Sequence, residues 1–304
     1  MKFSFLKDRS NPFRENKIHE LTLEEENQLE KNLIWVFASP RSGTQWLGTQ
    51  LLEHNTIICH GPSIGLNLGS IHQGFTDKVV RQIEFRGDEP DYFLSKQYKD
   101  IWTFFMRKFI LNRLFSQYKD LTKKIVIPDP EGSIGADIIA SCLQNSTAIV
   151  LFRDGRDVVD SIIDAAKPDS WHVKTRGLPP LKPEKRKNRI KLASRRWVRQ
   201  VEILEDIHEN ILKKSLKIKY EDLKKNTLNE LISIYRFMEI EISNQKLEEL
   251  VNKYSFNKIP DSKKGTGQVT RSASPGKWKE NFSEDEQMIM NDIMNEKLKE
   301  LGYL

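Results

Sequence analysis

Cysteine is scarce in this sequence of 304 residues, and no long apolar segment interrupts it. The two cysteines, Cys59 and Cys142, are too few for a disulfide framework and lack the paired spacing of a zinc site, so we expect two buried thiols. No apolar run approaches the roughly 18 residues that identify a membrane-spanning helix. The mean hydropathy of −0.57 agrees. The sequence therefore predicts no membrane span.

The sequence also lacks a secretory leader and a metal-binding pattern. The only apolar stretch near the start, Phe3 to Leu6, is much shorter than the core of a signal peptide and lies among charged residues. We therefore expect a cytoplasmic protein. The carboxylates show no spacing that would demand an ion, and we expect no metal.

Basic residues outnumber acidic residues only slightly. The 49 basic and 43 acidic residues give a net charge of +6 and a pI near 9.1, which suits an anionic partner, but no nucleic-acid motif is present. Residues 182–199 are the most basic segment, and apolar Trp197, Val201 and Leu204 lie on the same expected helix. This pattern favours the solvated face of an amphipathic helix over a surface that recruits substrate. We expect a small polyanionic ligand and no nucleic acid.

Apolar runs alternate with helical patterns along most of the chain. We expect residues 31–304 to form one α/β domain and residues 1–30 to be a polar appendage with one short helix near residues 21–26. The expected strands are 33–38, 56–59, 125–127, 147–152 and 215–219, and the expected helices are 44–54, 91–118, 133–143, 156–166 and 185–212. This order predicts a central, mostly parallel sheet with helices on both faces and ligands at the carboxyl ends of the strands.

An anion-binding turn is predicted directly after the first strand, in the segment Ser39 to Trp46. Gly43 lets the backbone approach a ligand, Ser42 and Thr44 supply hydroxyls, and Arg41 supplies a positive fork. The following helix adds unpaired N–H groups at its N-terminus. The ordinary nucleotide loop, G-x-x-x-x-G-K-[ST], is excluded because two glycines and a lysine are missing.

A second strand followed by a turn and a helix occupies residues 148–161. Arg153 stands at the strand exit, and Ser161 lies one to two turns into the next helix, so both are expected to reach one phosphate group. The alternative is that Arg153 forms a structural ion pair with Asp157.

The first turn resembles the 5′-phosphosulfate loop of the sulfotransferase family, which uses 3′-phosphoadenosine 5′-phosphosulfate (PAPS) and usually reads Pro-Lys/Arg-Ser-Gly-Thr-Thr-Trp. The resemblance implies a P-loop-like sulfotransferase fold and activity. It also implies that Arg153 and Ser161 bind the 3′-phosphate, because the family places an Arg and a Ser at this spacing. The implied donor-binding residues of the first turn are Arg41, Ser42, Gly43, Thr44, Gln45 and Trp46.

A third segment, Arg271 to Lys279, resembles the C-terminal loop of the same family, Arg-Lys-Gly-x-x-Gly-x-Trp-Lys. Arg271 and Gly276 are in register with it, whereas Ser272 and Ala273 replace the usual Lys and Gly. The resemblance further implies an adenine pocket formed by three aromatic residues, which are Trp46, Tyr220 and Phe256.

Catalysis requires stabilisation of developing charge, for which Arg41 is best placed, and a base for the acceptor proton. The candidates for the base are His60, Asp129 and Glu131. His60 needs little tuning of its pKa, whereas a carboxylate would need desolvation. The acceptor is expected to be a hydroxyl or an amine on a small molecule, a carbohydrate or a lipid. A homodimer is left open.

Two other functions compete with this one. A small-molecule kinase that uses ATP would share the strand, loop and helix, and a relative without catalytic activity would bind the nucleotide only. A nucleic-acid-binding module built on the basic helix is a further alternative.

Overall fold

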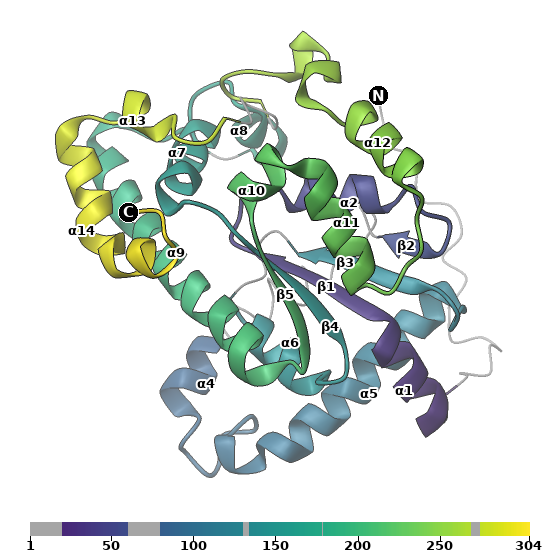
Figure 1. Cartoon of the computed structure of the whole chain (residues 1–304). Coiled ribbons are helices and arrows are strands. Elements are labelled where there is room, and N and C mark those ends of the chain that lie inside the picture. The colour runs from purple at the N-terminus through teal and green to yellow at the C-terminus, as the bar shows by residue number, and fades with distance from the viewer. Residues whose placement is uncertain (1–19, 60–79, 130–133, 178, 269–273) are drawn as a thin grey trace, which may run out of the picture.

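The computed structural model describes residues 20–59, 80–129, 134–177, 179–268 and 274–304, and these form a helix-covered parallel sheet (Figure 1). The sheet order is β2-β3-β1-β4-β5, and every neighbouring pair is parallel. The strands are β1 (Leu33–Ala38), β2 (Ile57–Cys59), β3 (Lys124–Asp129), β4 (Thr147–Phe152) and β5 (Lys214–Lys219). The predicted fold class and all five predicted strands are confirmed.

The two central strands are buried along their whole length. All six residues of β1 and all six of β4 are buried, which explains why both strands are almost entirely apolar in sequence. β5 lies at the sheet edge and is half-buried, with Lys217 and Lys219 alternating with apolar neighbours. The sheet core is thus centred on the two strands that lead into the predicted anion-binding turns.

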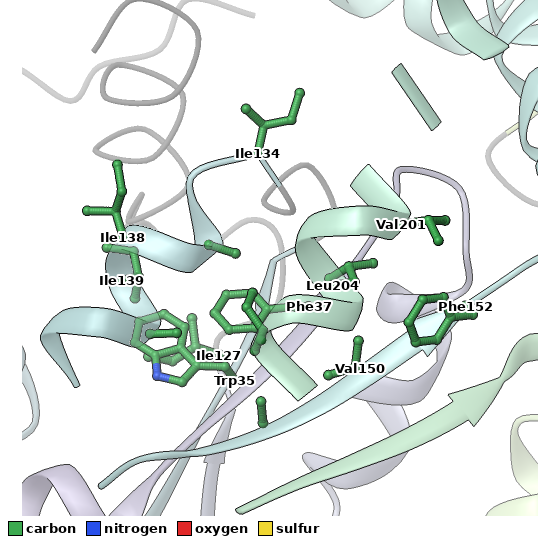
Figure 2. Packing of buried hydrophobic residues seen from close by; sticks show 14 of the residues in the cluster. Trp35, Phe37, Ile127, Ile134, Ile138, Ile139, Val150, Phe152, Val201 and Leu204 are labelled. Carbon is green, nitrogen blue, oxygen red and sulfur yellow. The ribbon is translucent and has the colours of Figure 1, made fainter. Parts of the chain in front are cut away.

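Helices cover both faces, and β1 sends alternate side chains to each. Trp35 and Phe37 pack with the helices of one face, and Ile34 and Val36 pack with those of the other. The first face is covered mainly by α5 (Lys99–Tyr118), α6 (Ala136–Cys142), α7 (Gly155–Ala165), α9 (Arg186–Asp206) and α14 (Glu284–Glu300). The second is covered by α2 (Thr44–Leu51), α10 (Tyr220–Lys225), α11 (Thr227–Phe237) and α12 (Asn244–Lys253). Figure 2 shows the first cluster, where α6 and α9 meet the strands.

Three further helices in the described structure are short, α4 (Arg81–Arg86), α8 (Trp171–Arg176) and α13 (Trp278–Asn281). Single 3₁₀ turns lie at Lys96–Tyr98, Pro183–Lys185, Phe256–Lys258 and Asp261–Lys263. No helix among the described residues is long and apolar enough to cross a membrane.

Several predicted helix boundaries were wrong. The helix expected over 91–118 begins only at Lys99, because the chain before it turns back and the Lys96 N–H bonds to the Gly87 carbonyl. The helix expected over 133–143 begins at Ala136, after Gly135 in the left-handed conformation. The helix expected over 185–212 ends at Asp206 and continues as a π-helical turn, Ile207–Ile211. Its apolar stripe, with Trp197, Val201 and Leu204, is buried as predicted.

The segment expected to be an N-terminal appendage is packed into the fold where it is described. Helix α1 (Leu23–Asn32) buries Leu29, and Arg107 of α5 pairs with two buried carboxylates of α1, Glu26 at 2.5 Å and Glu30 at 2.8 Å. The capping box of Thr22 and Glu25 starts the helix. A short helix was predicted here, but its contact with Arg107, about eighty positions away, was not.

Cys142 is a free, buried thiol, as predicted. Burial raises its pKa to about 12, so it is inert near neutral pH. The side chain of Cys59 lies outside the described part of the structure.

Candidate anion-binding site

Three turns meet at the carboxyl ends of neighbouring strands. The turn after β1 starts at Ser39, the turn after β4 starts at Arg153, and β5 ends at Lys219, immediately before Tyr220. Because β1, β4 and β5 are consecutive in the sheet and parallel, these turns lie together at the carboxyl end of the sheet (Figure 1). This is where ligands bind in sheets of this type.

The turn after β1 leaves the N-terminus of α2 open. Gly43 is the N-cap residue in the left-handed conformation, with φ +89°, and no side chain caps the helix. No acidic residue lies in its first turn. The first N–H groups of a helix carry a partial positive charge and need acceptors, so this end favours an anion.

Gly43 also has no room for a side chain. A Cβ atom at this position would lie 2.7 Å from two ring carbons of Tyr220. We expect Gly43→Ala to lower the free energy of unfolding by about 1–3 kcal/mol, from the clash and the positive φ together. Chemical denaturation measures this change.

Gly265→Ala is the matched control, since Gly265 has φ +103° and a Cβ there would meet no described atom within 4 Å. The loss of unfolding free energy in Gly265→Ala should reflect backbone strain alone. An equal loss in both variants would show that the Tyr220 contact does not restrict position 43.

Arg41 links the turn to helix α7. Its Nε donates to the Ser161 hydroxyl at 2.9 Å, and its guanidinium lies 5.6 Å from the centre of the Trp171 ring. Arg41 has φ +70°, an uncommon conformation for a residue with a side chain. The structure therefore brings Arg41 and Ser161 together and holds the arginine in a strained backbone.

Arg153 lies beneath the same turn and is only 8% exposed. Its Nη1 donates to the Arg41 carbonyl at 2.5 Å, and its guanidinium lies 4.5 Å from the centre of the Tyr220 ring. Its Nε is buried without a hydrogen-bond partner among the described residues. No ion pair within 4 Å joins Arg153 to Asp157 in the described structure, although the positive charge of Arg153 still acts on the Asp157 carboxyl. A buried guanidinium with an unused N–H fits an anionic oxygen.

The polar side chains of the turn after β1 differ in how far they are exposed to solvent. The Ser42 hydroxyl is fully buried and lies 2.9 Å from the Ser39 hydroxyl, so it braces the turn from inside. Thr44 is buried, and Gln45 is exposed.

The three predicted adenine-pocket aromatics make separate contacts in the structure. Trp46 is half-buried, and its indole N–H donates to the Tyr254 carbonyl at 2.9 Å. Tyr220 is buried against Gly43 and Arg153, and burial raises its pKa. Phe256 is half-buried two residues after Tyr254, with Lys264 over its ring.

Several predicted site residues lie outside the described structure. These are His60, Glu131 and Arg271, together with the side chain of Asp129. Strand β3 ends at Asp129, which is in register with Phe37 of β1. The Asp129 backbone therefore lies at the same carboxyl end of the sheet as the three turns.

Gly276 is positioned by a residue that the sequence analysis did not assign to the site. Its N–H donates to Asp157 Oδ2 at 2.7 Å, while Asp157 Oδ1 is buried without a hydrogen-bond partner among the described residues. Burial raises the pKa of the Asp157 carboxyl. The aspartate was considered only as an ion-pair partner, because its true partner lies 119 positions away.

A second network missed by sequence reasoning fixes the turn after β4. Asp154 caps α7 through the Arg156 N–H and binds the Arg156 guanidinium at 2.8 and 3.0 Å. Glu221 accepts the Asp154 N–H at 3.1 Å and the Tyr303 hydroxyl at 2.9 Å, and burial raises its pKa. The repeated Arg-Asp spacing in residues 153–157 was the available signal.

Comparisons with known proteins place this geometry in context. A family model described as the sulfotransferase domain matches residues 140–302, more than half of the chain. Comparison with curated protein sequences found no match.

Solved structures with a similar fold include a mouse sulfotransferase complexed with PAP, with a TM-score of 0.54 and 17% identity over 92% of this chain and 91% of that chain. A sulfotransferase from Mycobacterium avium has a TM-score of 0.49 and 13% identity, over 88% and 76% of the two chains. The sulfotransferase domain of the Synechococcus PCC 7002 olefin synthase has a TM-score of 0.46 and 17% identity, over 86% and 93%. At these identities the likeness to the mouse protein shows the fold.

Proposed function

The chain belongs to the sulfotransferase domain family, and we propose that it transfers the sulfuryl group of PAPS to a hydroxyl or an amine of an acceptor. One observation carries the proposal. Arg41 of the turn after β1, Arg153 of the turn after β4 and Ser161 of α7 converge beside the uncapped N-terminus of α2. A donor with phosphate at both ends needs this combination of guanidinium, hydroxyl and free N–H groups.

We assign the 5′-phosphosulfate to the turn after β1. The N–H groups at the start of α2, the Thr44 side chain and Arg41 supply the contacts, and Gln45 lies exposed beside them. The buried hydroxyl of Ser42 supports the turn through Ser39.

We assign the 3′-phosphate to Arg153, Ser161 and Arg271. The unused Nε of Arg153 supports this assignment, because a buried donor without a partner costs free energy that an anionic oxygen would recover. Gly276 gives its N–H to Asp157, so we infer that it shapes this part of the pocket and does not itself donate to the phosphate. Trp46, Tyr220 and Phe256 are proposed for adenine, which gains about 1–3 kcal/mol when it stacks on an aromatic ring.

The reaction forms one bond to sulfur and breaks another. The acceptor oxygen or nitrogen attacks the sulfur in line with the bridging oxygen of the 5′-phosphate, the sulfur–oxygen bond to PAP breaks, and the acceptor proton passes to a base. Arg41 stabilises the negative charge that grows on the departing and terminal oxygens.

The base is proposed among His60, Asp129 and Glu131. Alanine replacement of the true base should remove the acidic limb of the pH profile of kcat/KM and lower turnover by about 10²–10⁴-fold. The measurement is sulfuryl transfer from PAPS over a pH series. If all three variants keep the wild-type profile and turnover, none of these residues deprotonates the acceptor.

The proposal is tested by the choice of nucleotide. Binding of PAP but not of ATP supports a sulfotransferase, whereas preference for ATP supports the kinase alternative. Binding of PAP without transfer from PAPS to any acceptor in a panel of carbohydrates, phenols and lipid alcohols supports a non-catalytic relative. The cytoplasmic location and a metal-free reaction stay predictions of the sequence, and a homodimer stays open.

A further inference from the structure

Helix α7 carries an unusual buried acidic face. Asp157, Asp160 and Asp164 are 0%, 3% and 4% exposed. Their spacing of three and four residues places them on one side of the helix. Carboxylates are rarely buried without a partner, because the charged form loses its hydration.

Each of these carboxylates accepts hydrogen bonds from one stretch near the C-terminus. Asp157 accepts the Gly276 N–H at 2.7 Å, and Asp164 accepts the Gly267 N–H at 2.9 Å. Asp160 accepts the Asn281 side-chain amide at 3.0 and 3.2 Å. Gly267, Gly276 and Asn281 thus all donate hydrogen bonds to aspartates of α7.

Asp157 has the fewest partners of the three carboxylates. Among the described residues Gly276 gives it its only hydrogen bond and its Oδ1 has no partner, whereas Asp164 also binds Lys167 at 2.9 Å. A helix selected for stability alone would bury apolar residues here. Buried carboxylates that persist despite the cost of burial often belong to functional sites.

Helix α7 and the turn before it carry two residues of the proposed donor site. Arg153 stands two positions before α7, and Ser161 lies next to Asp160 and bonds to Arg41. Helix α7 is therefore in contact with the turn after β1 through Ser161 and with Gly267, Gly276 and Asn281 through its aspartates.

We propose that Asp157 and Asp160, with Asp164, are positioning residues for the 3′-phosphate of the donor: through Gly267, Gly276 and Asn281 they hold in place helix α7, which carries Ser161 and follows directly after Arg153. The inference rests on the proposed function, since it assumes that the donor binds at the carboxyl end of the sheet. The aspartates do not touch the phosphate, which they would repel. They hold the segment that carries Arg153 and Ser161, the two described groups proposed to touch it.

Two nucleotides that differ only in the 3′-phosphate test this role, PAP and AMP. The dissociation constants of both are measured by calorimetry for the wild type, Asp157→Ala and Asp160→Ala. We expect each variant to weaken PAP about tenfold, the effect of losing one charge-assisted hydrogen bond, and to change AMP less than about threefold. Asp157→Asn retains an acceptor for the Gly276 N–H and should keep most of the selectivity for PAP.

Two further variants separate positioning from folding. Asn281→Ala removes the exposed partner of Asp160 and should weaken PAP in the same way, and the double variant with Asp160→Ala should be no weaker than the worse single variant. Asp292→Ala changes an exposed aspartate on α14 and should alter neither dissociation constant.

The outcomes are distinct. Equal weakening of PAP and AMP, or no change in either, overturns the positioning role. A wild type that does not prefer PAP to AMP overturns the donor assignment itself, before any variant is considered.

Discussion

Removal of the Arg41 side chain is expected to lower kcat by about 10²–10³-fold, the usual effect of losing one preorganised group that stabilises transition-state charge. The position of Arg41 supports this proposed role, since it bonds to Ser161 from the turn that precedes the open N-terminus of α2. Arg41→Lys should retain more activity, because a positive charge remains. Steady-state transfer from PAPS measures both variants.

The backbone of Arg41 calls for a specific control. Its φ of +70° is strained for any residue with a Cβ, so Arg41→Ala keeps the strain and Arg41→Gly relieves it. Both variants should lose activity to the same degree while Arg41→Gly unfolds less readily. Arg236→Ala, an exposed arginine on α11, should match the wild type. A loss below tenfold in Arg41→Gly would contradict a role in charge stabilisation.

The second large effect is expected for Arg153→Ala. A ligand at 100 times its dissociation constant adds about 2.7 kcal/mol to stability, so PAP should raise the unfolding temperature of the wild type by several degrees. The variant should lose this increment, because the buried guanidinium with the unused Nε is gone. ATP should have no comparable effect on either protein.

The increment from PAP, and not the absolute unfolding temperature, is the quantity to compare. Arg153 also bonds to the Arg41 carbonyl and packs on Tyr220, so the variant will be less stable without ligand. Arg153→Lys keeps the positive charge but loses the paired N–H donors of the guanidinium. It should therefore recover part of the rise in unfolding temperature that PAP causes. Stabilisation by PAP that survives in Arg153→Ala would place the 3′-phosphate elsewhere.

Local chemistry made part of the site predictable. The strand Leu33–Ala38, the glycine after it and the start of α2 are consecutive in sequence, and each follows from its own residues. Arg153 and Ser161 could be paired because one helix joins them. The predicted boundaries failed where a distant segment decided them, as at Lys96, whose N–H bonds to Gly87 before α5 begins.

Pairs that are far apart in the sequence were not predictable. The acidic residues of α1 looked like a solvated surface, yet Glu26 and Glu30 are buried by Arg107. Asp157 looked like an ion-pair partner for Arg153 and instead holds Gly276, and the link from Tyr303 to Glu221 spans 82 positions. A carboxylate followed by apolar residues has the same local pattern whether it faces water or a backbone N–H from another segment.

By itself, the sequence determined the strands, the parallel character of the sheet and the presence of Arg41, Gly43 and Arg153 in the turns after two of the strands, because periodicity and the freedom of glycine act within a few residues. Only the tertiary structure decided that Arg41 bonds to Ser161, that Arg153 lies buried with one N–H unused, and that the aspartates of α7 hold the chain near Gly276. These are contacts between segments, and their energies depend on burial and distance, which no local pattern records.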